Sequence, residues 1–361
     1  MELARSAEQQ ELADAVERFC QQQITPERLT AWGQQARGID PAAWRAIGAL
    51  GWFGLGLPES CGGSGLGLTD VGVLLQECAR GLVPRSVINA IRASWALARL
   101  DADTPELSRL ATGDAVVALA LDEQSARQPL QYRTAIEGIG AARVRGEKWY
   151  VPNGMHADWH VVAGREGDGL SVVLVDAAPT KRRALRPFDG EEQAIIAFEG
   201  AAGRRLTPAG DGAAALHRLQ REATALALAE MVGGAQAALD TTVAYVKERE
   251  QFGQKIAVFQ AVQHQIADMA MSFTAAKHLA WQAITRMDAG TEDGTELDLA
   301  AAYVAPAFKR LTLAAHHLHG GAGFVVEHPL HWHSERAQAL AIRYAPEAPA
   351  LEAVATQLLG E

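Results

Sequence analysis

The spacing of apolar residues changes twice along this chain of 361 residues, and that change constrains the fold more than any other feature. Before about residue 112 and after about residue 208, apolar side chains recur every three or four residues, as in amphipathic helices. Between them the apolar runs are short, β-branched and bounded by glycine or charged turns. We therefore expect three domains: an N-terminal α-helical domain over 1–112, a middle domain over 113–207 that is a small antiparallel β-sheet or β-barrel, and a C-terminal four-helix bundle over 208–361.

The clearest predicted element is a long helix that starts at Ile256. From Ile256 to Met287 the apolar residues follow one another at steps of three or four, which places them on one face of a helix. The glycine-dense stretch 57–67 is predicted to be a loop. The other expected helices are 7–19, 41–55, 69–79, 213–247, 294–317 and 330–342.

Five short segments are expected to form the strands of the middle domain. Each is rich in β-branched or apolar residues and ends at a turn signal, which is typical of a small antiparallel sheet or barrel. The segments are 116–124, 141–151, 157–164, 170–177 and 193–200. The predicted fold class is therefore mostly α with a central β domain.

Composition excludes several classes of partner. The chain carries 33 basic and 43 acidic residues, a net charge of −10, which argues against nucleic acid and against an anionic membrane surface. Its start lacks the cationic and apolar regions of a signal peptide, and no apolar run is long enough to span a bilayer. The three cysteines have no metal-binding or redox spacing, so we expect reduced thiols in a cytoplasmic protein.

Histidines gather near the end of the chain, which raises the question of a metal site. No pair has the four-residue spacing that would place two rings on one helix face, and the two H-x-H pairs straddle a turn or face different ways. We therefore predict no metal site, and we expect most of these residues to be interface or surface residues. The histidines are His316, His317, His319, His328, His331 and His333.

The stretch 245–270 carries the most information about function. It predicts a helix that ends near Glu250, a turn at Gly253 and a second helix. Taken alone, Arg249 could simply be a cation that complements the helix dipole, and Phe252 a turn anchor. The R-x-x-F-G turn followed by F-Q and A-D-M, however, resembles the acyl-CoA dehydrogenase family. LPESCGGSGLG (57–67) and LHGGAGFVVEHPLHWHSERA (318–337) resemble two further family segments, so the resemblance covers essentially the whole chain.

The resemblance implies a flavoenzyme that dehydrogenates the α,β bond of an acyl-CoA thioester and passes electrons to an electron-transfer flavoprotein or a similar acceptor. FAD would lie between the middle and C-terminal domains, with Arg249 at its pyrophosphate and Phe252 and Gln260 near its adenosine half. The glycine turn, together with the two histidines before it, would approach the FAD of a neighbouring subunit. These last residues are His317, His319, Gly320, Gly321 and Gly323.

Four positions depart from the family pattern where it carries chemistry. Asp122, Glu123 and Gln124 stand where the family has T-E-P, and His317 stands where it has glutamine. Pro152 replaces the threonine of W-I-T-N and offers neither a hydroxyl nor an N–H to the flavin. The catalytic glutamate position falls on Ala345.

Two glutamates are weak candidates for the missing base, and neither is secure. Glu347 lies two residues late, in a stretch that Pro346 and Pro349 predict to be a loop. Glu222 lies beside Ala223, where some members place the base early in a helix. Either could equally be a solvated surface carboxylate, and Glu230, inside an apolar helix, is expected to be a structural polar tie.

Loss of the base and of the flavin-ring contacts, with the cross-subunit contacts kept, resembles the β-type helper subunits of heteromeric bacterial steroid side-chain acyl-CoA dehydrogenases. The chain is thus predicted to pair with a homologous α-type subunit in an α2β2 complex that acts on a bulky, steroid-like CoA ester, with FAD shared with or held mainly by the partner. The alternatives are a self-sufficient homotetramer that uses Glu347 or Glu222, a same-fold flavoenzyme of other chemistry, and a scaffold without flavin.

Overall fold

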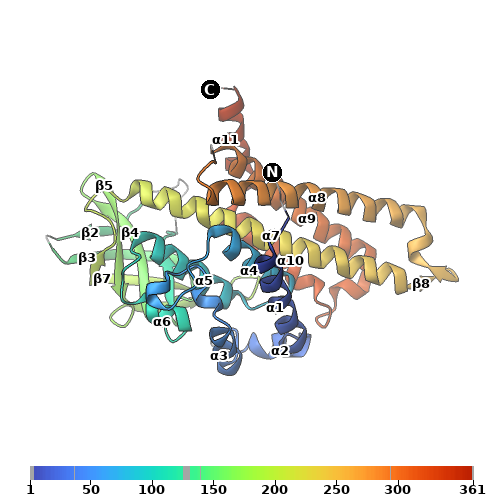
Figure 1. Cartoon of the computed structure of the whole chain (residues 1–361), viewed down its shortest axis with the longest axis horizontal. Helices are drawn as coiled ribbons and strands as arrows, with labels where there is room; N and C mark the ends of the chain where they lie inside the picture. Colours follow the sequence, from blue (N-terminus) through green and yellow to red (C-terminus); the bar gives the residue numbers. More distant parts are fainter. Residues whose placement is uncertain (1–3, 36, 125–130, 139, 293, 360–361) are drawn as a thin grey trace. The chain divides into compact units, whose positions relative to one another are not determined.

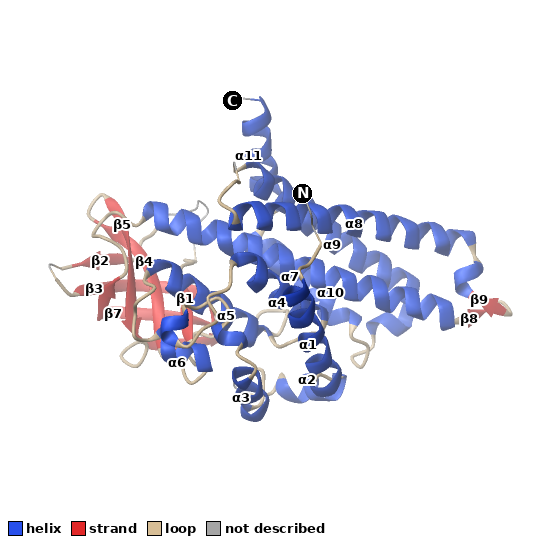
Figure 2. Ribbon diagram, viewed as in Figure 1, coloured by secondary structure: helices blue, strands red, loops and turns tan. Residues whose placement is uncertain are grey.

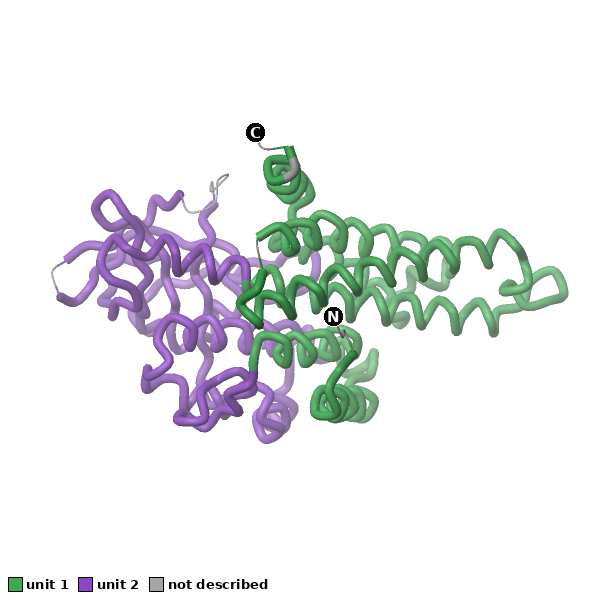
Figure 3. Tube along the Cα trace, turned by 45° about the horizontal axis from the view of Figure 1, so that its top comes forward, with its two compact units in different colours: residues 1–29, 67–83, 222–361 green, residues 30–66, 84–221 purple. Residues whose placement is uncertain are grey.

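The computed structural model describes residues 4–359 apart from 36, 125–130, 139 and 293, and its internal contacts form two compact units (Figure 3). Unit 1 comprises residues 1–29, 67–83 and 222–361, and unit 2 comprises residues 30–66 and 84–221. The described chain is mostly helical with a sheet in the middle of the sequence (Figure 2), which confirms the predicted fold class.

Unit 1 consists almost entirely of helices. In Figure 1, α7, α8 and α9 run side by side, and the short β8–β9 hairpin projects where α7 passes into α8. The helices are α1 (Ala7–Gln23), α4 (Leu68–Arg80), α7 (Ala213–Glu248, of which 222–248 belong here), α8 (Gln260–Asp288), α9 (Thr295–His319), α10 (Leu330–Tyr344) and α11 (Glu347–Leu359). None of the helices within the described ranges is both long and apolar enough to cross a lipid bilayer.

The predicted helices of the bundle agree with α7, α9 and α10 to within about two residues. The long helix begins later than expected, because Ile256–Val258 form a 3-10 turn and α8 starts at Gln260. The loop predicted around Glu347 is wrong: α11 starts at that residue. Pro346 and Pro349 lie before the helix and in its first turn, where the missing N–H groups break no helical hydrogen bond.

Two adjacent glycines in α7 let its neighbours approach closely. A Cβ at Gly233 would lie 1.9 Å from the backbone oxygen of Gln76 in α4, and a Cβ at Gly234 would lie 2.5 Å from the ring of Phe308 in α9. Real Cβ atoms never come so near, so only glycine fits at either position. The pair therefore sets how closely α4 and α9 pack against α7.

Gly233→Ala is expected to lower the free energy of unfolding by about 2 kcal/mol or more, because the backbone of α4 cannot yield as a side chain can. Gly72→Ala in α4 is the matched control. Its Cβ would meet Trp281 at an ordinary 3.4 Å, so the gain in helix propensity should make it neutral or stabilising by up to about 1 kcal/mol. Urea unfolding of both variants measures the difference, and equal stabilities would contradict the packing argument.

Unit 2 contains a closed sheet and short helices. The pairings β4–β2, β2–β3, β3–β7, β7–β5 and β5–β4 form a ring, while β1 adds to β4 and β6 to β7. The strands are β1 (Val117–Ala120), β2 (Ala135–Glu137), β3 (Ala142–Pro152), β4 (Trp159–Glu166), β5 (Gly169–Asp176), β6 (Lys181–Leu185) and β7 (Gln193–Arg205). The helices wholly within unit 2 are α3 (Pro41–Ala49), α5 (Arg85–Leu100) and α6 (Leu107–Thr112), while α2 (Pro26–Trp32) spans the boundary.

All five predicted strands are present, although β1 is shorter than the segment 116–124. The sequence reading missed β2 and β6. β2 has only three residues, and β6 reads KRRAL, which is mostly charged and has none of the β-branched character of the other strands. β6 pairs along its whole length with β7, so hydrogen bonding holds it in the sheet despite its weak propensity.

Candidate functional site

The R-x-x-F-G motif forms a tight hairpin. Glu250–Gln251 (β8) pairs with Gln254–Lys255 (β9), and the two residues between them, Phe252 and Gly253, have left-handed φ values of 55° and 79°. Positive φ at both positions matches the twist that a two-residue hairpin turn requires. The side chain of Phe252 is 92% exposed, and its ring meets Phe259 edge-on at 6.0 Å. The predicted turn at Gly253 is confirmed.

The last turns of α7, just before this hairpin, contact the residue that precedes the glycine turn. Tyr245, one helical turn before Arg249, stacks on the ring of His319 with centroids 4.3 Å apart. Its hydroxyl donates to the backbone oxygen of His319 at 3.3 Å. The structure thus brings together two motifs that lie about seventy residues apart in the sequence.

The glycine turn exposes part of its backbone. Gly320–Phe324 form a 3-10 turn in which Gly320 has a left-handed φ of 56°. A Cβ at Gly320 or Gly321 would meet nothing within 4 Å, whereas one at Gly323 would lie 2.9 Å from the Cβ of His319. Gly320 and Gly321 therefore present bare backbone to the outside, and Gly323 is a packing residue.

Two histidines beside the turn are buried with unused ring nitrogens. His319 bonds the backbone oxygen of Ala315 through Nδ1 at 2.8 Å, while its Nε2 has no hydrogen-bond partner among the described residues. His316 stacks on Phe324, and its Nδ1 likewise has no partner there. Burial lowers the pKa of both rings, so both are neutral near pH 7.

The expectation that most of the clustered histidines are interface or surface residues is wrong for His316 and His333, which are 7% and 4% exposed. Both lie on helix faces that turn inward, and burial lowers the pKa of His333 to about 3. His317 is exposed, as expected for a turn-edge residue. Within the described part of the chain, no three His, Cys, Asp or Glu residues are placed to hold a metal ion.

The strand position expected to face the flavin ring holds a buried ion pair. Glu123 meets the Nζ of Lys148 at 2.8 Å and accepts from the amides of Arg133 and Thr134 at 2.8 and 3.0 Å. Lys148 is fully buried and lies 3.9 Å from the ring centre of Tyr132. Burial lowers the pKa of Lys148 to about 8, although Glu123 opposes that change. Burial alone would raise the pKa of Glu123, but Lys148 and the two amides bring it below its usual value.

The position at which the family has a threonine hydroxyl is also buried. Pro152 and Asn153 are both buried, and the Asn153 side chain donates to the backbone oxygen of Ser86 at 2.8 Å. Asn153 has a left-handed φ of 57°, which asparagine tolerates. The residues of this segment are therefore committed to contacts within unit 2.

The two places where a base was expected come together. The Thr224 hydroxyl donates to the backbone oxygen of Tyr344 at 3.1 Å, so the early part of α7 touches the residue before Ala345. Ala345 is buried and brings no carboxylate, and Glu347 is exposed at the start of α11. Glu222 is 6% exposed, so its reading as a solvated surface group is wrong. Glu222 lies two residues before Thr224, which forms the contact with Tyr344.

A further buried polar network in unit 2 escaped the sequence reading. Arg85 meets Asp189 at 2.8 Å and Glu191 at 3.4 Å, and Asn89 also bonds Glu191. Beside it, burial raises the pKa of Glu192 to about 7, although the amide of Met155 donates to this carboxylate at 3.1 Å. The arginine of this network lies about a hundred positions before its two carboxylates, so no local sequence pattern could reveal the network. Tyr245, by contrast, could have been predicted as a site residue, because it lies four residues, about one helical turn, before Arg249.

Comparisons with known proteins agree with this architecture. Residues 6–101 match the family model for the acyl-CoA dehydrogenase N-terminal domain, and residues 210–358 match the model for the C-terminal domain of the same family. The chain therefore belongs to the acyl-CoA dehydrogenase family, whose members are FAD-dependent oxidoreductases that act on CH–CH donors.

Individual relatives cover nearly the whole chain. Benzylmalonyl-CoA dehydrogenase of Aromatoleum aromaticum is 28% identical over 349 residues, which cover 91% of this chain and 92% of that protein. A variant of the Tcur3481-Tcur3483 steroid ACAD is 27% identical with a TM-score of 0.89, covering 98% of both chains. The ChsE4-ChsE5 complex from Mycobacterium tuberculosis is 25% identical with a TM-score of 0.90, covering 100% of both chains.

The residues in unit 1 fit the phosphate and adenosine half of FAD. Arg249 and Gln260 are exposed, Gly320 and Gly321 offer open backbone, and the buried Nε2 of His319 has no hydrogen-bond partner among the described residues. An exposed guanidinium and a glycine backbone that no Cβ shields suit a pyrophosphate. At the expected ring-facing positions of unit 2, Pro152 has neither a hydroxyl nor an N–H to offer, and Glu123 is paired with Lys148.

Glu123→Ala is expected to lower the free energy of unfolding by about 3–5 kcal/mol, since it leaves the Lys148 ammonium buried without its partner. Replacing both residues, as Glu123→Leu with Lys148→Met, should recover most of that loss. In Glu123→Ala, stability should rise with pH from about 7 to 10, because the unfolded chain keeps the lysine proton longer than the folded chain does.

The control is the exposed pair of Lys181 and Glu199, which are 2.6 Å apart. Glu199→Ala should change the unfolding free energy by less than about 1 kcal/mol. Urea unfolding across this pH range measures all four proteins. A loss in Glu123→Ala no larger than that in Glu199→Ala would show that the buried pair is not structural.

Proposed function

We propose that this chain is the β-type subunit of a heteromeric acyl-CoA dehydrogenase, paired with a homologous α-type chain in an α2β2 complex. The observation that carries the proposal is a difference between two parts of the expected FAD site. The groups suited to FAD phosphates are open, whereas the groups expected at the flavin ring and at the substrate α-carbon are absent or engaged elsewhere. The division into domains 1–112, 113–207 and 208–361 belongs to this proposal.

In this scheme the chain binds and orients rather than transferring protons. Bound FAD supplies the acceptor for the hydride that leaves the β-carbon of the acyl group. Arg249 would pair with the pyrophosphate, and Gly320 and Gly321 would allow the FAD of a neighbouring subunit to approach closely. Phe252 and Gln260 lie along the adenosine half, and His317 and His319 flank the glycine turn. The base that removes the α-proton comes from the α-type partner.

Two of the relatives support a substrate class. The two solved structures named above are a steroid ACAD and a two-component complex, and both align with almost the whole of this chain. We propose a bulky acyl-CoA ester of the steroid side-chain type, with electrons leaving to an electron-transfer flavoprotein or a similar acceptor. In this scheme the chain places no side chains of its own against the flavin ring, and this leaves space for a bulky acyl group.

Arg249→Gln is expected to weaken FAD binding by the complex by about 10- to 100-fold, the loss of one charge-assisted contact to phosphate. The complex is obtained by co-expression with the homologous partner, and flavin absorbance per complex is measured after gel filtration. Lys247→Gln, an exposed cation at the same helix end, is the matched control and should retain FAD. Full flavin content in Arg249→Gln would contradict the assignment.

One observation favours a second candidate, a self-sufficient acyl-CoA dehydrogenase with Glu222 as its base. Glu222 is buried two residues before the contact between Thr224 and Tyr344, where the family's two base positions meet. Glu222→Gln would then reduce turnover of the chain alone by about 10²-fold or more, while Glu347→Gln would leave it unchanged. The helper proposal predicts no measurable turnover by the lone chain, and two equally active variants would exclude Glu222 as the base.

A further inference from the structure

A cavity of about 630 Å³ lies within unit 1, apart from every residue assigned above to the flavin site. Its walls come from the start of α1, from α4, from α7 near Gln236 and from α8 between Lys277 and Thr285. All of these segments belong to one compact unit, so the cavity is a feature of that unit alone. Its volume falls in the range of small-molecule sites.

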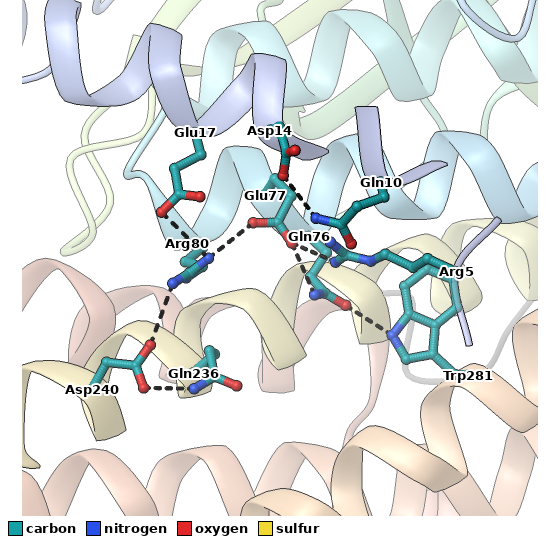
Figure 4. Close-up of polar contacts among 10 residues, drawn as sticks. All are labelled: Arg5, Gln10, Asp14, Glu17, Gln76, Glu77, Arg80, Gln236, Asp240 and Trp281. Carbon is teal, nitrogen blue, oxygen red and sulfur yellow. Dashed lines mark hydrogen bonds and ion pairs between the residues drawn. The ribbon is translucent and has the colours of Figure 1, made fainter. Parts of the chain in front are cut away.

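A charged network forms one wall of the cavity (Figure 4). The Glu77 side chain is 4% exposed and meets Arg5 at 2.5 Å and Arg80 at 3.5 Å. Gln76 donates to Glu77 at 3.1 Å and accepts from the indole N–H of Trp281 at 2.8 Å. The negative charge of Glu77 is therefore balanced, and Trp281 is held in one orientation.

Three of the other lining side chains keep a group open to a ligand. Lys277 is exposed on α8, and within the described ranges it has no ion-pair or hydrogen-bond partner. Gln10 and Gln236 donate their amide groups to Asp14 and Asp240, both at 2.7 Å, which leaves their carbonyl oxygens available as acceptors. The cavity thus combines a cation, two acceptors and an aromatic side chain.

Among the described residues, Lys277 is the lining cation without a carboxylate partner, and it favours an anion. Arg5, Arg80 and Lys277 bring three positive charges against the single carboxylate of Glu77. Arg80 shares its charge with Glu17 and Asp240 at 3.8 and 3.5 Å, outside the lining. Lys277 is therefore the group left to neutralise a bound anion.

We propose that this cavity binds a nucleoside phosphate. The phosphate pairs with the Lys277 ammonium, the base packs against the Trp281 indole, and amino groups of the base donate to the carbonyl oxygens of Gln10 and Gln236. The proposal goes beyond the proposed function, because none of these residues takes part in it.

The test is isothermal titration of AMP and of ADP into the full-length protein, in complex with its partner where it is purified so. One nucleotide should bind per chain of this kind, and Lys277→Ala should weaken binding about tenfold, or about 1.4 kcal/mol. Lys181→Ala, an exposed lysine of unit 2, is the control and should bind as the wild type does. Arg249→Gln should also bind AMP normally, which separates this cavity from the flavin site.

Several outcomes would overturn the proposal. They are no binding at millimolar nucleotide, equal loss in the two lysine variants, and loss in Arg249→Gln but not in Lys277→Ala. Inorganic phosphate binding as tightly as AMP would show an anion site without recognition of a base. Circular dichroism of Lys277→Ala confirms that it folds, and none of these failures bears on the shared-flavin proposal.

Discussion

The helical unit depends on one close approach, the contact between the backbone of α4 at Gln76 and the bare Cα of Gly233 in α7. No side chain fits between these two helices at that point, so their separation is fixed by backbone atoms. The residues after Gln76 on α4, Glu77 and Arg80, form the charged wall of the cavity. Further along α7, Tyr245 stacks on His319 beside the glycine turn, and Arg249 follows the end of the helix. One packing constraint therefore underlies both sites of unit 1.

The polar groups of the two candidate half-sites differ in whether they already have hydrogen-bond or ion-pair partners within the protein. At the glycine turn, the Nε2 of His319 has no partner among the described residues and no side chain shields Gly320 or Gly321, while Tyr245 holds His319 in place. In unit 2 the corresponding groups have found partners inside the protein, with Lys148 neutralising Glu123 and Ser86 accepting from Asn153. A buried charge that is already paired gains little by turning toward a ligand and would lose its partner by doing so. This asymmetry is the physical basis for proposing that FAD is shared with a second subunit.

Periodicity made the fold predictable, whereas the site was predictable only in part. The steps of three and four that locate α8 and the short β-branched runs that locate β4 and β5 arise from burial, which acts on every residue of an element. The tight turn at Gly253 could be foreseen because glycine marks such turns. The strand β6 and the ion pair of Glu123 with Lys148 could not, since they depend on partners brought close only by folding. The helix α11 was missed because proline breaks a helix interior but not its first turn.

The most direct test of the central claim is the ratio of FAD to protein chains in the complex of this subunit with its homologous partner. Flavin absorbance of the purified complex, with chain composition from native mass spectrometry, gives that ratio. The account predicts one FAD for each pair of unlike chains, with this chain alone purifying without flavin. One FAD for every chain, or a lone chain that is saturated with FAD and active, would contradict it.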